Sequence, residues 1–449
     1  MIELDYLDEL VAELWLRERG ARESASHLMR VLFREERLRP KQQKRVKELF
    51  HRMLSSQAMI DYALEAAAPG AIVEALQAPV RVLVSRVLSG DLSPKAARAR
   101  LAWFDWERVA HVAAEIRCLD DPVRRLQLSG SIPEWLARRL VELLGAEAQP
   151  CLDALIGRAP VTLRANTLRC SRDELAARLA AEGIETRATR FATHGLEVLT
   201  PAQLFRTKAF HEGWFELQDE ASQLVAEVVA PPPGGLVVDV CAGAGGKTLA
   251  LAAALGNRGS VVALDVHAAR LSELRRRARR AGAHNLRVFR TKADAWSEEV
   301  VELLRRADRV LVDAPCSGLG SLRRNPDMRR RISEEEIRRL RGIQLDLLTR
   351  TAALLRPHAR VVYATCTFLP EENETVVAEV CQRDPQLDPV RVVELLGGER
   401  GRPVADADGV FLQTLPHRQG TDGFFAAVLR RHGNVHSTRP KTRATGTEP

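Results

Sequence analysis

The sequence lacks the residue patterns that mark zinc-binding, exported and membrane-spanning proteins. Its seven cysteines form no Cys-x-x-Cys pair and no spacing typical of metal ligands, so we expect no metal. Residues 1–5 lack the basic start and apolar segment of a signal peptide, and no apolar run reaches ~18 residues. An odd number of cysteines suits a reducing compartment. These absences predict a cytoplasmic protein with no membrane attachment.

Two common phosphate-binding motifs are also absent. Residues 236–240 form an apolar run that enters a glycine turn at 243–246, followed by a helical stretch at 249–255. A phosphate loop would need glycine at position 241, which is Cys, and a dinucleotide fingerprint starting at Gly243 would need glycine or alanine at position 248, which is Thr. The turn can still bring backbone N–H groups close to an anionic ligand.

Carboxylates follow the predicted strands downstream of this turn. Asp265 ends the run 261–264, Asp294 follows the short strand 287–289, and Asp313 ends the run 310–312. Such acids at strand ends are placed to accept hydrogen bonds from a ribose. A glycine turn without phosphate-binding chemistry, followed by these acids, suits a nucleoside joined to a zwitterionic amino acid. The pattern therefore predicts S-adenosylmethionine as the cofactor.

Two cysteines also follow predicted buried strands. Cys316 comes just after the run 310–313, and Cys366 just after the run 361–365. Open α/β sheets place their chemistry at strand ends, so two thiols in one cleft would suit covalent catalysis. The alternative is a pair of half-buried structural cysteines, which behave as small apolar groups.

Length and charge indicate several domains and a polyanionic partner. At 449 residues the chain exceeds the ~100–200 residues of one domain, and its 45% hydrophobic content is enough for packed cores. The net charge is +8 and the pI is about 9.4, which favours a partner such as RNA. Basic clusters occur at residues 41–47, 275–280 and 323–331. We interpret 275–280 as a solvated helix face and 323–331 as a contact to an RNA backbone.

Eight sequence blocks, in one order, resemble the RsmB/NOP (Sun/Fmu-type) RNA cytosine-C5 methyltransferases, and among them the bacterial enzymes that act on small-subunit (16S) rRNA. The blocks are residues 164–168, 218–222, 241–248, 313–318, 323–327, 363–366, 370–374 and 422–425. The resemblance implies an α/β fold: a Rossmann-like class I S-adenosylmethionine-dependent methyltransferase domain, preceded by a small α/β module and an all-α NusB-like N-terminal domain. It also implies a monomer.

The resemblance assigns roles to individual residues. Cys366 matches the nucleophile that adds to carbon 6 of cytosine, Cys316 matches the group that assists release, and Asp313 would contact the cofactor or the target base. DNA cytosine methyltransferases use a Pro-Cys nucleophile, so Pro315 with Cys316 would give the opposite roles. The implied cofactor-binding residues are Cys241, Ala242, Gly243, Ala244, Gly245, Gly246, Lys247, Asp265, Asp294 and Asp313.

One block departs from the family's pattern. The turn usually reads Cys-Ala-Ala-Pro-Gly-Gly-Lys, whereas Gly243 and Ala244 stand at its third and fourth places. Proline restricts the free backbone before a ligand arrives, so its loss predicts a looser turn and weaker cofactor binding, not an inactive site. Lys247 can be read either as part of the site or as a solvated lysine at an ordinary helix start.

The chain divides into four predicted segments. Residues 1–150 read as helices, with Val46, Leu49, Phe50, Met53 and Leu54 on one face. This segment is either an RNA-binding arm or a packing domain. Residues 151–230 read as a small α/β substrate-binding module with strands at 161–168, 184–188 and 196–199, and Ser171 with Glu174 as a helix capping box. Prolines at 231–233 mark the start of the methyltransferase domain, 231–432, and 433–449 reads as a disordered tail.

The sequence therefore predicts an RNA methyltransferase that forms 5-methylcytosine in 16S rRNA. Two alternatives stay open: transfer RNA as the substrate, because the same catalytic blocks serve both, and a catalytically silent RNA-binding factor in ribosome assembly. Intact Cys366, Cys316 and Asp265 argue against the silent factor.

Overall fold

A computed structural model describes residues 4–20, 25–68, 70, 72, 74–325 and 328–433. The chain forms two compact units. One comprises Met1–Ala159, Ser317–Ile337 and Leu415–Gly420, and the other comprises Pro160–Cys316, Arg338–Thr414 and Thr421–Pro449. The predicted tail lies, apart from Gly433, outside the described residues.

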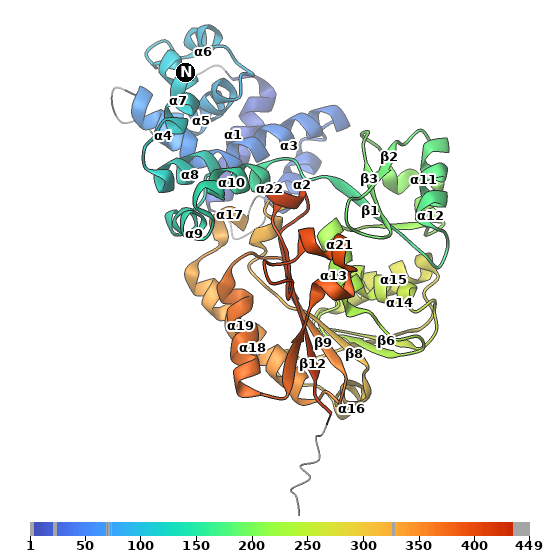
Figure 1. The fold of residues 1–449 in the computed structure, drawn as a ribbon. Helices are drawn as coiled ribbons and strands as arrows, with labels where there is room; N and C mark the ends of the chain where they lie inside the picture. Colours follow the sequence, from blue (N-terminus) through green and yellow to red (C-terminus); the bar gives the residue numbers. More distant parts are fainter. Residues whose placement is uncertain are drawn as a thin grey trace, which may run out of the picture. The chain divides into compact units, whose positions relative to one another are not determined.

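The first unit is helical (Figure 1). Its N-terminal helices pack around one apolar core, in which the face of α3 predicted from the sequence is buried: Val46, Leu49, Phe50, Met53 and Leu54. Two later segments of the chain belong to this unit, and Glu147 accepts hydrogen bonds from His417 and Arg418, each at 2.8 Å. The helices are α1 (Tyr6–Gly20), α2 (Ala25–Glu35), α3 (Pro40–Ser55), α4 (Gln57–Ala67), α5 (Glu74–Leu88), α6 (Pro94–Arg100), α7 (Trp106–Arg117), α8 (Pro122–Gly130), α9 (Glu134–Leu144), α10 (Ala148–Ile156), α17 (Met328–Arg331) and α22 (Pro416–Gln419).

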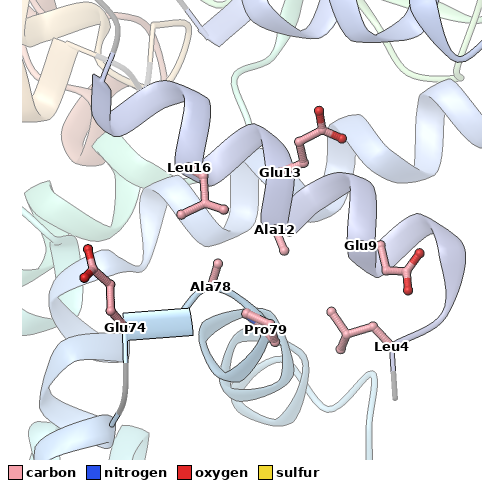
Figure 2. Close-up of a pocket in the computed structure, with 8 residues that line it drawn as sticks. All are labelled: Leu4, Glu9, Ala12, Glu13, Leu16, Glu74, Ala78 and Pro79. Carbon is pink, nitrogen blue, oxygen red and sulfur yellow. The ribbon is translucent and has the colours of Figure 1, made fainter. Parts of the chain in front are cut away.

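A hollow of about 480 Å³ lies between α1 and α5 (Figure 2). Its lining combines apolar side chains with three carboxylates, those of Glu9, Glu13 and Glu74. Negative carboxylates repel phosphate groups, so this hollow is unsuited to an RNA backbone. Its other lining residues are Leu4, Ala12, Leu16, Ala78 and Pro79.

The second unit begins with a small antiparallel sheet of order β2-β3-β1-β4. Its strands are β1 (Val161–Ala165), β2 (Thr186–Ala188), β3 (Gly195–Val198) and β4 (Phe215–Leu217), with helices α11 (Arg172–Ala181) and α12 (Lys208–His211). The predicted capping box at the start of α11 is confirmed, because Ser171 and Glu174 each accept the other's backbone N–H. The sequence did not predict β4, whose three residues are too few to show a periodic pattern.

The larger sheet of the second unit has the order β10-β12-β9-β8-β5-β6-β7, with β11 also paired to β12. Strands β5 to β9 are parallel, and β12 and β10 run antiparallel to them. The chain order reverses between β5 and β8, the place where open α/β sheets bind ligands beyond their strand ends. The strands are β5 (Leu236–Asp239), β6 (Ser260–Asp265), β7 (Leu286–Arg290), β8 (Arg309–Asp313), β9 (Arg360–Thr365), β10 (Leu387–Val390), β11 (Leu412–Thr414) and β12 (Phe424–Arg431).

Helices cover both faces of this sheet (Figure 1). Alternate strand residues serve the two layers: Val237 packs in one apolar cluster and Val238 in the other. One layer holds α13 (Glu220–Val229), α14 (Gly246–Ala254), α15 (Ala268–Ala281) and α20 (Val392–Leu395). The other holds α16 (Glu298–Arg306), α18 (Glu334–Ala353) and α19 (Glu374–Arg383), and the short helix α21 (Gly398–Gly401) follows α20. The predicted Rossmann-like α/β class with a helical N-terminal region is confirmed.

No helix among the described residues is long and apolar enough to cross a bilayer. Within the same residues, no group of three or more His, Cys, Asp or Glu side chains is arranged to hold a metal ion.

Candidate active site

Cys316 and Cys366 lie side by side beyond the carboxyl ends of two neighbouring parallel strands. β8 pairs with β9, and the chain beyond each strand end carries one of the two thiols. Their Sγ atoms are 3.3 Å apart, and the backbone N–H of Cys366 donates to the Cys316 sulfur at 3.3 Å. The structure therefore brings together the two thiols that the sequence singled out.

The Cys316 thiol holds its proton tightly. The pKa of Cys316 is raised well above its ordinary value, first by its hydrogen bond to Cys366, then by burial and by the negative charge of Cys366. Cys316 thus keeps its proton and can donate it to a Cys366 thiolate. Because thiolates are the nucleophilic form of cysteine, a Cys316 that keeps its proton acts here as a hydrogen-bond donor to its neighbour.

A buried polar network joins the two cysteine loops. The Gln344 side chain, on α18, donates at 2.9 Å both to the carbonyl of Pro315 and to the carboxylate of Glu372. The next residue, Asn373, accepts from the Thr365 hydroxyl and donates to the Thr367 carbonyl at 3.0 Å. The block 370–374 belongs to the family resemblance, but the sequence assigned no role to its residues. Gln344 was not predicted, because nothing distinguishes one glutamine within a long helix.

Lys247 is buried and is not a solvated lysine. Its side chain is buried at the start of α14, where Nζ lies 2.6 Å from Asp313 Oδ2 and 5.0 Å from the ring centroid of Phe424. Burial opposes its charge, but Asp313, followed by Cys366 and Asp239, raises the pKa of Lys247. Lys247 therefore carries its positive charge beside Asp313, and this charge interacts with Cys366.

The glycine turn is tied to the end of β6. Asp265 Oδ2 accepts from the Gly243 N–H at 2.9 Å, and Oδ1 accepts from the His267 N–H at 2.7 Å. Gly245 has φ +88°, and a Cβ there would meet a Leu274 methyl carbon at 2.1 Å, so this position needs glycine. The turn leads directly into α14, and the first N–H groups of this helix have no partner within the helix.

The residues around the turn fit S-adenosylmethionine. A Cβ at Gly243 would meet nothing within 4 Å, so there is room above the turn. Asp239 is buried, and its Oδ1 has no hydrogen-bond partner among the described residues, while Oδ2 accepts from Thr248 at 2.7 Å. An orphaned carboxylate oxygen suits the cofactor's ammonium, and the helix start suits its carboxylate. The sequence pattern assigned no role to Asp239.

Comparisons with known proteins agree with this geometry. The protein-family model described as "16S rRNA methyltransferase RsmB/F" matches residues 226–430. A second family model, "Methyltr_RsmF/B-like, ferredoxin-like domain", matches residues 132–204. The probable ribosomal RNA small subunit methyltransferase B of Bacillus subtilis is 37% identical over 70% of this chain and 70% of its own length. The chain belongs to the RsmB/F family. It is an S-adenosylmethionine-dependent rRNA methyltransferase, which confirms the predicted cofactor and the resemblance.

Other proteins similar to this RsmB/F-family chain include one with the same name and two solved structures. The corresponding protein of a Synechocystis strain is 33% identical over 67% of both chains. Among solved structures, that of the protein PH0851 is 25% identical over 95% of this chain and 98% of its own, with a TM-score of 0.72. A methyltransferase homologue from Pyrococcus horikoshii is 27% identical over 70% of this chain and 100% of its own, with a TM-score of 0.58.

Two of the residues predicted to bind cofactor are placed differently from the rest. The Cys241 side chain packs against one of the apolar clusters that cover the sheet, and burial raises the pKa of its thiol. Asp294 is exposed in the loop after β7, and its backbone carbonyl accepts from Arg350 at 3.0 Å. A role for either residue in binding stays a prediction.

Several arginines of the basic clusters in this RsmB/F-family chain are buried or bonded within the protein, which the sequence did not predict. In α15, Arg277 and Arg280 do not belong to a solvated face, because both are largely buried against Glu216. In the last cluster, Arg329 is buried and Arg323 donates to the Gly420 carbonyl at 3.0 Å. Pro326, Asp327 and the side chains of residues 330 and 331 lie outside the described residues, and the RNA contact of this cluster stays a prediction.

Proposed function

We propose that this protein forms 5-methylcytosine in small-subunit rRNA through a covalent bond between Cys366 and carbon 6 of the target cytosine. The observation that carries the proposal is the 3.3 Å contact between the two sulfurs at the ends of β8 and β9. Carbon 5 of cytosine is too electron-poor to accept a methyl group unaided. A thiolate that adds to carbon 6 solves this problem, because it moves electron density onto carbon 5.

Cys366 acts first. Its thiolate forms the Sγ–carbon 6 bond, and the electron pair of the carbon 5–carbon 6 double bond moves towards carbon 5. The Cys316 S–H and the ammonium of Lys247 favour this thiolate before the attack. S-adenosylmethionine, when bound, supplies a methyl group on a positively charged sulfur, which leaves as a neutral thioether once carbon 5 has taken the methyl.

Cys316 acts last. Formation of the adduct removes both the hydrogen bond to the Cys366 thiolate and its charge, which raise the pKa of Cys316, so Cys316 can release its proton to solvent at this stage. As a thiolate, Cys316 can then take the proton from carbon 5. The electron pair of that C–H bond restores the double bond, and the Sγ–carbon 6 bond breaks to return Cys366 as a thiolate. Each sulfur thus has a separate step.

In this proposal Asp313 connects the glycine turn with the two cysteine loops. Its Oδ2 is held by Lys247, and its side chain is partly exposed, so it can contact the cofactor or the hydrogen-bonding edge of the target base. The cofactor-binding set extends along the turn 241–247 with Asp265, and we add Asp239 for its orphaned oxygen.

We further propose that the protein acts as a cytoplasmic monomer with the predicted segments 1–150, 151–230 and 231–432. In this arrangement the first segment, NusB-like in position, is an RNA-binding arm. The acidic hollow between α1 and α5 would then lie off the RNA path.

The test is methyl transfer from radiolabelled S-adenosylmethionine to purified substrates. We expect label in small-subunit RNA stripped of modification, and 5-methylcytidine as the labelled nucleoside after digestion and chromatography. Label in transfer RNA alone would support the transfer RNA alternative, and no label in either would support the silent assembly factor. Bisulfite sequencing of rRNA from a deletion strain then identifies the cytosine.

A further inference from the structure

Two carbonyl groups of the glycine turn accept hydrogen bonds from arginines outside it. Arg277 of α15 donates to the carbonyl of Ala244 at 2.7 Å. Arg164 of β1 donates to the carbonyl of Gly246 at 2.8 Å. These contacts come from two different elements, and each fixes one peptide of the turn.

The arginines are themselves held rigidly. Glu216 of β4 is buried and accepts from Arg277 Nε at 3.1 Å and from Nη2 at 2.8 Å, and it also pairs with Arg280. Arg164 is buried and bonds the Gln218 side chain. Burial lowers the pKa of Arg164 to about 10, so the guanidinium still carries its charge at neutral pH. Because Nε and Nη2 of Arg277 both donate to the same Glu216 oxygen, the direction of this guanidinium is fixed.

The turn needs such support. Gly243 and Gly245 both have positive φ, +55° and +88°, and glycine is free to leave such conformations when nothing holds it. Ala244, between them, lacks the fixed φ that proline would supply. Because a peptide is planar, fixing the carbonyl of Gly246 also fixes the direction of the Lys247 N–H, one of the unpaired donors at the start of α14.

We propose that Arg277, together with Arg164, is a positioning residue that holds the cofactor turn in its binding conformation before the cofactor arrives. This inference rests on the proposed function, because it takes the turn as the cofactor site. The two guanidinium groups also place positive charge behind the helix start, which adds to its attraction for a carboxylate. Pre-organisation of this kind improves affinity by reducing the ordering cost of binding.

The test compares Arg277→Lys with Arg279→Lys. Lysine keeps the charge beside Glu216, but a single ammonium cannot reproduce the planar fork that reaches both Glu216 and Ala244. Arg279 is exposed on the same helix, and its side chain has no hydrogen bond or ion pair among the described residues, so it is the matched control. Calorimetry with S-adenosylhomocysteine should give Arg277→Lys a Kd about tenfold above wild type, and Arg279→Lys an unchanged Kd.

Two further measurements separate positioning from general stability. At saturating cofactor, kcat of Arg277→Lys should stay within about twofold of wild type while KM for S-adenosylmethionine rises. Amide hydrogen exchange of residues 241–248 in the free protein should be faster in Arg277→Lys than in Arg279→Lys. If Arg277→Lys does not fold, Arg164→Lys is measured against the same criteria.

The outcomes distinguish this inference from the proposed function. Wild-type affinity and unchanged exchange in Arg277→Lys would overturn the positioning role while leaving the cofactor site intact. Full cofactor binding by Asp265→Ala would instead show that the turn is not the site, and would remove the basis of both.

Discussion

Lys247 and Asp313 form an ion pair of 2.6 Å between the start of α14 and the end of β8. The pair joins the turn assigned to the cofactor with the strand that precedes Cys316. It also keeps an ammonium near Cys366, whose charge in turn raises the pKa of Lys247. In the proposed mechanism, one lysine therefore links the charge state of Cys366 with the cofactor turn.

Replacing Lys247 with methionine should slow the alkylation of Cys366. Loss of the nearby positive charge disfavours the thiolate, and a change of ~1.4 kcal/mol corresponds to about tenfold in rate. The measurement is iodoacetamide labelling at pH 7.5 with mapping by mass spectrometry. The exposed Lys292→Met is the control and should label like wild type. Equal labelling of Cys366 in all three proteins would contradict a role for Lys247 in activating the thiol.

Cofactor binding should strengthen as pH rises through about 7. Burial, opposed by the Thr248 hydrogen bond and reinforced by the Asp313 charge, raises the pKa of Asp239 to about 7. The cofactor's ammonium favours the ionised carboxylate, so binding below that pH must first expel a proton. Between pH 6 and 8 the association constant should rise about tenfold, since one pKa unit is ~1.36 kcal/mol.

The control for this pH profile is Asp239→Asn, which should remove the rise. In the free protein the sign is opposite, because the folded state keeps a proton that the unfolded chain loses between about pH 4 and 7. The contribution of Asp239 to stability therefore falls as pH increases through that window. A wild-type profile that matches that of Asp239→Asn would rule out an ionised Asp239 in binding.

Much of the candidate site could be predicted from the sequence, because the ends of buried strands can be recognised from their apolar runs. Apolar runs placed Asp265, Asp313, Cys316 and Cys366 at the ends of strands, and parallel pairing then brings those ends to one edge of the sheet. The sequence could not show which neighbours hold them. Gln344 comes from the middle of a helix whose pattern reports only its apolar face.

The arginines of α15 show the same limit. A run of arginines on a helix reads as a solvated face, and Arg275, Arg276 and Arg279 are indeed exposed. Arg277 and Arg280 turn instead towards Glu216, which lies on the short strand that the sequence did not predict. A buried ion pair between distant segments leaves no local pattern, because its partners are chosen by the tertiary fold.

Replacing Gln344 with methionine should impair catalysis more than cofactor binding. The change removes the two donations that connect the Pro315 carbonyl with Glu372, leaving buried acceptors with one partner fewer. Such a loss costs about 1–3 kcal/mol of stability. We expect a lower thermal midpoint and about a tenfold lower kcat, with an unchanged Kd for S-adenosylhomocysteine. A Kd that rises as much as kcat falls would show that the network serves the whole sheet edge and not the cysteine loops.

Introducing proline at position 244 should tighten cofactor binding. Proline removes conformations from the free turn, and at compatible positions this contributes about 0.4–1 kcal/mol, or a two- to fivefold lower Kd. The measurement is calorimetry with S-adenosylhomocysteine, with thermal unfolding to confirm that Ala244→Pro folds. Weaker binding by a folded variant would show that the turn with Gly243 and Ala244 adopts a backbone that proline cannot.

Covalent trapping on RNA that contains 5-fluorocytosine tests the central claim most directly. Fluorine at carbon 5 cannot leave as a proton does, so after methyl transfer the enzyme–RNA bond persists and survives denaturing electrophoresis. The account predicts a trapped complex with wild type, none with Cys366→Ser, and retained or accumulated complex with Cys316→Ala. A complex that persists in Cys366→Ser and disappears in Cys316→Ala would contradict it, as would the absence of any complex with the wild-type protein.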